Sequence, residues 1–367
     1  MSVQKRSAGA WRVRWQVGNR WESRTFATKK DADAFDAEVK RRRRLGSLSS
    51  LDAGLEVLDD YVTGTWAPVY AAQLAPKTQR LYTMLYDVHI APTLGSVPLR
   101  DLTAELIGRW QADRLAAGAG PISVRKALTL LGGILQRAVE SGRVSTNVAR
   151  LVRKTKLPRR AEIRPLAPAT IEAMRNASSA RNAALLSLLA YSGLRPGEAL
   201  ALRWADVRER TILVERSMSL GVERNTKTGQ HRTVRLLAPL AADLREWRMR
   251  SGRPADAELV FPGVDGRPWT EAAFESWRKC AFARAIKAAG VRARPYDLRH
   301  SFESLLLHEG RSVIYVARQL GHGAQLTLGT YGHVIDELED APQQDAESSI
   351  LAAREVSAAP ELPIAAI

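Results

Sequence analysis

The sequence predicts a multidomain protein that is mainly α-helical and contains small β-sheets. Its 367 residues exceed one ordinary domain and suffice for two or three, each with its own core. Residues 11–26 alternate apolar and polar side chains as a β-hairpin does, whereas residues 55–150 and the region from residue 168 onward show mostly helical spacing. Two short strand signals, residues 211–215 and 231–237, interrupt the helices of the second half.

The chain carries 55 Lys and Arg against 39 Asp and Glu, which gives a formal net charge of +16. This excess predicts a polyanionic partner, and nucleic acid is commoner than an anionic membrane for a chain without a lipid-facing segment. We find no apolar run long enough to span a bilayer, and residues 1–10 lack the apolar stretch of a secretory signal. The sequence therefore predicts a protein of the cytosol or the nucleoid, with no membrane partner.

Cys280 is the one cysteine of the sequence. A disulfide framework and a multi-thiolate zinc site both need several cysteines, so neither is expected. We expect Cys280 to be a small, buried apolar filler rather than a reactive thiol.

The N-terminal part of the chain predicts a small antiparallel sheet. In residues 11–17 the apolar side chains fall on one face of a strand, while Arg12 and Arg14 fall on the other. Gly18-Asn19 predicts a two-residue turn, after which residues 20–26 return as the partner strand.

A helix is predicted after this sheet. Thr28, with Asp31 three residues later, is typical of a helix N-cap, and the helix ends in a run of cations that includes Arg41 and Arg42. We expect residues 1–45 to form one module that contacts DNA through its arginines, although a solvated surface would carry the same residues.

Residues 54–150 predict a compact helical domain that follows a Gly- and Ser-rich linker. Proline and glycine, among them Pro76, Pro92 and Pro121, separate its amphipathic segments. The expected helices are residues 55–72, 77–90, 103–116 and 122–139. Nothing in this domain predicts catalysis.

Residues 151–167 form a basic stretch without apolar periodicity, which cannot pack and predicts an interdomain linker. Its candidate DNA-binding residues are Arg153, Lys154, Lys156, Arg159 and Arg160. Each cation that neutralises a phosphate releases counterions, so the affinity for DNA should fall with salt. A flexible tether without DNA contacts is the alternative.

Cations recur at the ends of short helical segments in the second half. Gly193 is placed to end one helix and Pro196 to open the next, which leaves Arg195 at a helix N-terminus that favours an anion. Lys227 lies in a polar turn between the two strand signals, at the expected tip of a hairpin. Arg299 lies in a second segment where Arg and His occur near the start of a predicted helix.

His322 and Tyr331 complete this constellation, and we expect the side chains to converge on one DNA phosphate. Guanidinium forks grip two phosphate oxygens and stay charged as negative charge develops in the transition state. Taken singly, each residue has a structural reading: an ion pair for an arginine, a satisfied core histidine, or a half-buried packing tyrosine. Their order and spacing favour function.

The same residues carry a family resemblance. Tyr-Ser-Gly-Leu-Arg-Pro-Gly-Glu at residues 191–198, then Lys227, then Asp-Leu-Arg-His-Ser-Phe at residues 297–302, precede Leu-Gly-His at residues 320–322 and Tyr331 nine residues after His322. This series resembles the tyrosine recombinases, specifically the bacteriophage integrases. It spans the second half of the chain in order. The helical middle looks like the family's core-binding domain, and the N-terminal module looks like its arm-binding domain.

The resemblance implies a site-specific DNA recombinase with an α+β catalytic domain at residues 168–338. Tyr331 would attack the scissile phosphate to give a 3′-phosphotyrosyl bond and a free 5′-hydroxyl, with no metal, cofactor or ATP. Arg195, Arg299 and His322 would clamp the phosphate, and Lys227 would protonate the leaving oxygen.

Supporting roles follow from the same resemblance. Glu198 and His300 would orient the side chains that contact the phosphate, without contacting it themselves. Tyr296 stands where the family usually has a histidine, and a neutral phenol is a poor proton acceptor near pH 7. The base for Tyr331 is therefore left open between the phosphate itself and water, with Tyr296 as a hydrogen-bond donor to the phosphate or, as an alternative, a rival nucleophile.

Partners are also implied. They are double-stranded DNA at core-type and arm-type sites, a homo-tetramer on two duplexes, and accessory DNA-bending or directionality proteins in the cytoplasm of a bacterial host. Residues 339–367 would form a tail that docks on a neighbouring subunit. The reaction would integrate or excise a phage or other mobile element. Two alternatives remain: a DNA-binding regulator of the same fold that does not cleave, and a topoisomerase-like strand-passing enzyme.

Overall fold

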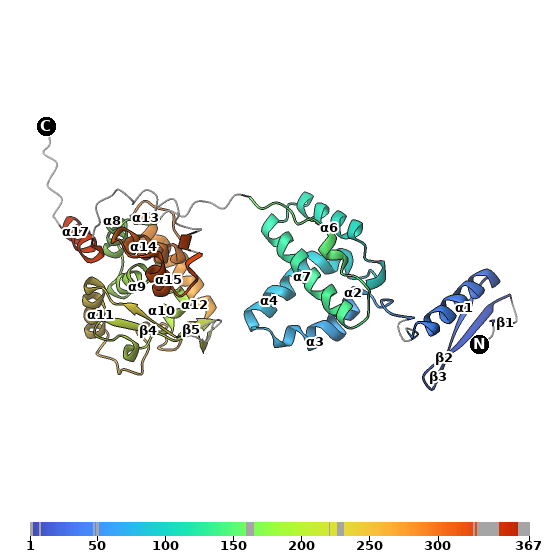
Figure 1. The fold of residues 1–367 in the computed structure, drawn as a ribbon. Helices are drawn as coiled ribbons and strands as arrows, with labels where there is room; N and C mark the ends of the chain where they lie inside the picture. Colours follow the sequence, from blue (N-terminus) through green and yellow to red (C-terminus); the bar gives the residue numbers. More distant parts are fainter. Residues whose placement is uncertain are drawn as a thin grey trace. The chain divides into compact units, whose positions relative to one another are not determined.

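The computed structural model divides the chain into two compact units, Met1–Arg160 and Ala161–Ile367 (Figure 1). The described residues are 3–6, 9–46, 48, 51–158, 165–219, 221–225, 231–325, 327–328 and 345–358. Helices predominate and the sheets are small, as predicted. No helix in these described ranges is long and apolar enough to cross a membrane.

The N-terminal module is a three-stranded antiparallel sheet with one helix. Its strands are β1 (Val3–Lys5), β2 (Trp11–Val17) and β3 (Arg20–Phe26), in the order β1-β2-β3, followed by α1 (Lys29–Arg44). The hairpin and the helix are confirmed, whereas β1 was not predicted because three residues are too few for an alternation signal.

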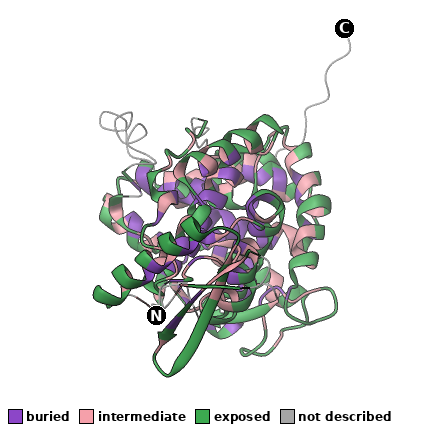
Figure 2. Cartoon of the chain, turned by 90° about the vertical axis from the view of Figure 1, so that its right-hand side faces the viewer, coloured by how far each residue is buried: buried purple, intermediate pink, exposed green. Residues whose placement is uncertain are grey.

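Burial explains why this module folds. Val13 and Trp15 on the inner face of β2 are buried together with Ala32 and Val39 of α1, whereas most of β3 is exposed (Figure 2). The Thr28 hydroxyl accepts the Asp31 N–H at 3.2 Å, which confirms the predicted N-cap.

The helical segment that follows has its own core. Its elements are α2 (Leu58–Tyr61), η2 (Val62–Trp66), α3 (Ala67–Val69), η3 (Ala71–Gln73), α4 (Pro76–Leu85), η4 (Tyr86–Ile90), α5 (Ala91–Leu94), η5 (Leu99–Asp101), α6 (Ala104–Ala116), α7 (Pro121–Glu140) and η6 (Val148–Leu151). Trp110 of α6 is buried, and its indole N–H donates to the His89 carbonyl at 2.7 Å. The four predicted helical segments are confirmed.

Pro92 was predicted to separate two helical segments, but it does not. The chain stays helical through Leu94, because η4 is a π-helical turn whose last N–H, that of Ala91, donates to the Tyr86 carbonyl. Pro92 then occupies the second position of α5, where a missing N–H costs little.

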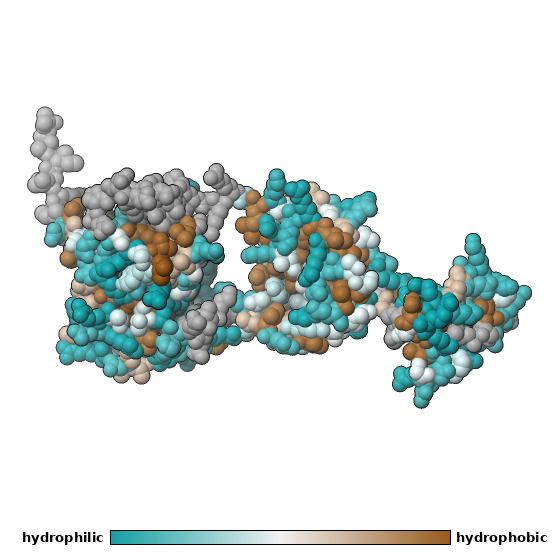
Figure 3. All heavy atoms as spheres, in the orientation of Figure 1, coloured by the Kyte–Doolittle hydropathy of each residue, from teal (hydrophilic) through white to brown (hydrophobic). Residues whose placement is uncertain are grey.

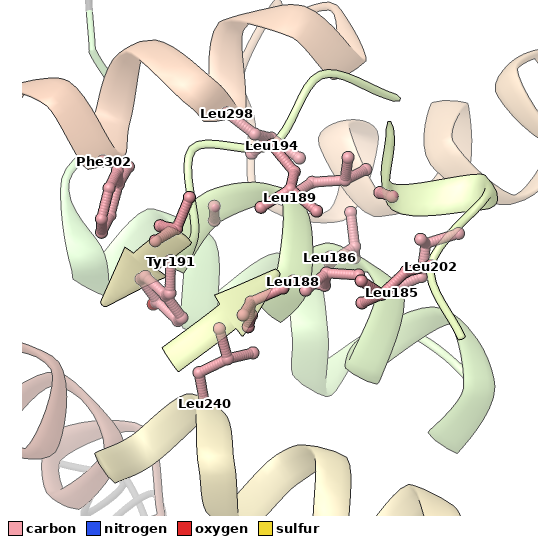
Figure 4. Packing of buried hydrophobic residues seen from close by; sticks show 14 of the residues in the cluster. Leu185, Leu186, Leu188, Leu189, Tyr191, Leu194, Leu202, Leu240, Leu298 and Phe302 are labelled. Atoms are coloured by element: carbon pink, nitrogen blue, oxygen red, sulfur yellow. The ribbon is translucent and has the colours of Figure 1, made fainter. Parts of the chain in front are cut away.

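The second unit contains the remaining helices and two short sheets. Its elements are α8 (Pro168–Asn176), α9 (Ala180–Tyr191), α10 (Pro196–Leu200), η7 (Trp204–Asp206), β4 (Thr211–Val214), β5 (Arg216–Ser219), β6 (Val222–Asn225), β7 (Arg232–Arg235), α11 (Ala238–Arg250), α12 (Glu271–Trp277), η8 (Arg278–Phe282), α13 (Ala283–Ala288), α14 (Pro295–His308), α15 (Val313–Leu320) and α17 (Ala346–Ala358). Helix α9 is buried from Ala184 to Tyr191, and Leu298 and Phe302 of α14 belong to the same core (Figure 4).

The two strand signals pair, but they do not form one simple hairpin. β4 and β7 are antiparallel partners, with Thr211 opposite Arg235, and a second hairpin of β5 and β6 lies between them in sequence. Lys227, predicted at the tip of the hairpin, lies outside the described residues. The sequence pattern did not predict β5 and β6, because their side chains are mostly polar and show no apolar alternation.

Cys280 is exposed, which corrects the expectation of a buried filler. It lies in η8, a π-helical turn between the buried Trp277 and Phe282. The five-residue turn shifts the phase of the helix, so an apolar stripe extrapolated at ordinary α-helical spacing misplaces Cys280.

The tail contains one described helix, α17, which packs on α8 and α11 of its own chain. Ala346 and Ile350 are fully buried. Near its other end, Arg354 donates to Asp243 of α11 at 2.6 Å.

Candidate active site

Arg195 is placed by a tight turn between α9 and α10. Gly193 has a φ of 65°, and a Cβ there would lie 2.6 Å from the Phe302 ring and 2.7 Å from Leu320, so only glycine fits. Arg195 then caps α10 in extended conformation, with its side chain 39% exposed. The helix is too short to define an anion site by itself, so the surrounding side chains must supply the rest.

Glu198 in the first turn of α10 holds Arg195 in place. Its carboxylate accepts the Arg195 backbone N–H at 2.8 Å and the guanidinium Nη1 at 2.8 Å. Arg232 of β7 donates to the same carboxylate through both terminal nitrogens, at 3.0 and 2.7 Å. Burial alone would raise the pKa of Glu198, but the hydrogen bonds and charges of Arg232 and Arg195 hold it below its ordinary value.

Arg232 is a site residue that the sequence analysis missed. Besides binding Glu198, its Nε donates to the Gln319 carbonyl at 3.0 Å, at the end of α15. A Cβ on Gly321 would lie 2.9 Å from the Arg232 Cδ, so the glycine admits the arginine stem. A signal existed, since Arg232 lies two residues before the buried Val234 and therefore shares the inner face of β7.

Arg299 of α14 is only 2% exposed. Its guanidinium donates to the Gly193 carbonyl at 2.5 Å and to the Leu320 carbonyl. Burial lowers the pKa of Arg299 to about 10, and the charge of Arg195 adds to the effect. The group therefore remains a cation at neutral pH, fixed between the turn before α10 and the end of α15.

His322 follows the left-handed C-cap of α15, where Gly321 has a φ of 67°. Its Nδ1 lies 3.2 Å from the Gly323 carbonyl, and its Nε2 lies 3.9 Å from Oε1 of Glu303. Burial is the main cause that lowers the pKa of His322; Gly323 and Glu303 oppose it, and Arg299 and Arg195 add to it.

The two remaining supporting residues lie on α14. Tyr296 is 42% exposed, and its ring meets the ring of His300 edge-on at 5.4 Å between centroids. His300 is buried, with Nδ1 3.6 Å from Oε2 of Glu303. The Arg299 guanidinium lies 6.0 Å from the centre of the Tyr296 ring.

The described residues thus bring Arg195, Arg299 and His322 to one place, around the Gly193 turn and the end of α15. Arg195 itself donates to the Gly321 carbonyl at 3.2 Å. Lys227 and Tyr331 lie outside the described residues. Within the described part of the chain, no group of three or more His, Cys, Asp or Glu could hold a metal ion.

The candidate DNA-binding residues of the N-terminal module differ in how they are held. Arg12 donates to the Ser23 hydroxyl at 2.6 Å, and Arg14 stacks over the Trp21 ring at 5.3 Å on the exposed sheet face. Arg41 and Arg42 both bind Glu38 within α1, at 2.7 and 2.6 Å. Figure 3 shows hydrophilic side chains over much of the face that α1 presents.

The candidate DNA-binding residues of the linker begin at the end of the first unit. Arg153, Lys154 and Lys156 are exposed, whereas Arg159 and Arg160 lie outside the described residues. Gln111 of α6 donates to the Arg153 carbonyl at 3.0 Å and accepts the Thr155 N–H at 3.2 Å. This clasp fixes the start of the linker on the helical segment.

Comparison with known proteins identifies the family. Residues 163–337 match the model of the phage integrase family. The chain is 30% identical over 332 residues to an integrase of Streptomyces ambofaciens, covering 83% of this chain and 82% of the relative. It is 26% identical over 322 residues to the putative prophage phiRv2 integrase of Mycobacterium tuberculosis, covering 84% of each.

The fold agrees with these relatives. The lambda integrase, solved as a tetramer bound to a Holliday junction, superposes with a TM-score of 0.60 at 17% identity, covering 89% of this chain and 94% of that one. The likeness shows a shared fold, and the family match shows the chemistry. The chain belongs to the phage integrase family and is a site-specific tyrosine recombinase, an enzyme that cleaves and rejoins DNA strands.

Proposed function

We propose that Arg195, Arg299 and His322 bind the scissile phosphate and that Tyr331 is the nucleophile. The observation that supports this assignment is the convergence of two guanidiniums and one imidazole, with Arg299 locked by the Gly193 and Leu320 carbonyls. Backbone carbonyls orient a guanidinium without neutralising it, so its charge remains for an anion.

The charge balance of the site favours a phosphodiester. Arg195 and Arg232 share the single carboxylate of Glu198, and Arg299 adds a third cation. Such a site carries fixed positive charge before DNA arrives, which suits a transition state that gains negative charge on the phosphate. Glu198 and Arg232 do not contact the phosphate in this proposal; Glu198, held by Arg232, keeps Arg195 in position.

The proposed reaction is a transesterification. The Tyr331 oxygen attacks the phosphate, and its phenolic proton passes to the phosphate or to water. A 3′-phosphotyrosyl bond forms, the bond from phosphorus to the 5′-oxygen breaks, and that oxygen leaves with a proton from Lys227. The 5′-hydroxyl of a partner duplex later reverses the attack, so bond energy is conserved. Tyr296 lies on the same helix as Arg299 and is exposed, which suits hydrogen bonding to the phosphate rather than proton abstraction.

We further propose that the chain acts as a homo-tetramer on double-stranded DNA, the assembly that the lambda integrase forms on a Holliday junction. In this proposal residues 54–150 bind the core site, and residues 1–45 bind a separate arm site. Arg12, Arg14, Arg41 and Arg42 supply arm contacts. The exposed cations of the linker at residues 151–167 bind backbone phosphates, and accessory DNA-bending or directionality proteins act with the chain on the bacterial nucleoid.

The tail belongs to the same proposal. Helix α17, within residues 339–367, packs on its own chain, and we propose that it docks on the equivalent seat of a neighbouring subunit when four chains assemble on DNA. The ion pairs of Arg354 and the buried Ile350 make that seat specific.

Covalent trapping on nicked duplexes tests the assignment. We select nicked duplexes from a randomised pool by their binding to the chain. After attack, the short fragment that carries the new 5′-hydroxyl diffuses away at the nick, so a protein–DNA adduct accumulates. We expect an adduct on denaturing gels for the wild type and for Tyr315→Phe, a matched tyrosine of α15, and none for Tyr331→Phe. An adduct that persists in Tyr331→Phe would contradict the nucleophile assignment.

A further inference from the structure

Glu303 is a buried carboxylate that the proposed reaction does not use. It lies on α14 one turn after Arg299 and is 2% exposed. Its Oε2 lies 3.6 Å from Nδ1 of His300, and its Oε1 lies 3.9 Å from Nε2 of His322. Among the described residues, Oε1 has no hydrogen-bond partner. A buried carboxylate oxygen without a hydrogen bond is costly, so its position beside an active-site imidazole calls for a role.

The protons of His322 indicate that role. Its Nδ1 faces the Gly323 carbonyl, which can only accept, so Nδ1 carries a proton. In a neutral ring Nε2 would then present a lone pair to the Glu303 carboxylate, and two acceptors repel each other. The contact between Nε2 of His322 and Oε1 of Glu303 is favourable only when a proton lies between the two atoms.

The surrounding charges show why a carboxylate is needed here. Arg299 of the same helix, Arg195 at the start of α10 and burial all disfavour the imidazolium of His322. Arg232 of β7 adds a further cation at the neighbouring Gly321, and His300 flanks the other carboxylate oxygen. Glu303 is the acidic group among these that opposes the cations at His322.

We propose that Glu303 is a positioning residue for His322: its carboxylate orients the imidazole and favours its protonated form, whose positive charge can act on the phosphate. The effect on cleavage rests on the proposed function, because it requires His322 to contact the scissile phosphate. Glu303 itself acts only through the histidine. Its influence on the imidazole exists in the free protein as well.

The direct test is the NMR titration of the His322 ring in the full-length protein without DNA. An opposite charge this close favours the charged form, so Glu303→Gln should lower the pKa of His322 by about one unit. Glu303→Asp, which keeps the charge, should lower it less. Glu309→Gln changes a carboxylate at the C-cap of the same helix, which pairs with Arg235 instead, and should leave the pKa of His322 unchanged. Equal His322 values in wild type and Glu303→Gln would overturn the proposal.

Cleavage of the nicked duplex gives the second readout. The limb of the pH–rate profile on which His322 loses its proton should move to lower pH in Glu303→Gln by the same shift, which is about tenfold in rate at a pH above both pKa values. Activity lost equally at every pH would contradict the role. Failure of the proposed function is separate: it appears as a wild type without a Tyr331-dependent adduct. Should Glu303→Gln not fold, Glu303→Asp carries the same titration, and an unchanged His322 would again overturn the proposal.

Discussion

Arg299 shows how much of this site is set by single residues. It is buried and held by the carbonyls of Gly193 and Leu320, which lie in two segments distant in sequence. A planar fork can reach both carbonyls and keep a further edge for an anion, whereas a lysine presents one point charge. The position therefore requires arginine.

Arg299→Lys should lower the single-turnover rate of cleavage by about 10²- to 10³-fold, the usual cost of losing a transition-state donor. Arg318→Lys, an exposed residue of α15, is the matched control and should change the rate little. A rate within about twofold of wild type for Arg299→Lys would contradict the assigned role.

At this scale the sequence predicted part of the site. Arg195, Arg299 and His322 carry a recognisable spacing, and the structure brings them together. The strand alternation places Arg232 on the inner face of β7, but it does not reveal the partner Glu198. Glu303 was missed because its contact with His322 is a tertiary contact that no local pattern encodes.

Glycines at close contacts and the carboxylate of Glu198 bring the helices and the strand of the site together. The turn at Gly193 lets the start of α10 approach α14 and α15, and Glu198 ties α10 to β7. Helices and the first hairpin were predictable from periodicity and capping. The second hairpin and the π turns were not, because mostly polar strands and a phase shift leave no regular apolar repeat.

Gly193→Ala tests the close approach. Alanine at positive φ costs about 1–2 kcal/mol, and the clash with Phe302 and Leu320 should add about 1–3 kcal/mol of overpacking. Gly290→Ala is the matched control, because Gly290 has a φ of 66° but open space around its Cβ position. Denaturant unfolding should show a larger loss for Gly193→Ala. Equal losses would mean that the turn relaxes without cost.

Glu198 makes stability depend on pH. Its folded pKa lies below the ordinary 4.5, so between these two values the folded state binds fewer protons than the unfolded one. Its contribution is therefore present above pH 4.5 and is lost as pH falls through the folded value.

Glu198→Gln should lose on the order of 3–5 kcal/mol at pH 7, because Arg232 and Arg195 lose their buried counter-charge. Thermal unfolding should show this gap from wild type shrinking below about pH 4.5. Glu246→Gln, which breaks an exposed pair with Arg250, should cost about 0–1 kcal/mol and serves as the control. A gap that stayed constant down to about pH 3 would contradict the lowered pKa of Glu198.

On the scale of the whole molecule, the basic composition and the family membership agree with a protein that acts on DNA. The positive charge and the order of the helical and mixed regions were predictable from composition and spacing. The packing of α17 on its own chain was not, because its seat is built by α8 and α11 far away in the sequence.

Truncation after residue 344 removes α17 and tests the tail. We expect this variant to bind DNA but to lose the tetramer in crosslinking on DNA, because the neighbouring seat stays empty. Arg354→Ala, which removes the ion pair with Asp243, should weaken assembly to a smaller degree. A truncated chain that still forms tetramers on DNA would contradict the exchange of the tail.

The assignment of Tyr331 is the central claim, and peptide mapping of the trapped adduct tests it most directly. After nuclease digestion, mass spectrometry should find the nucleotide remnant on the peptide that contains Tyr331, joined through a 3′-phosphate. A remnant on the peptide that contains Tyr296, or on any residue other than Tyr331, would contradict the account.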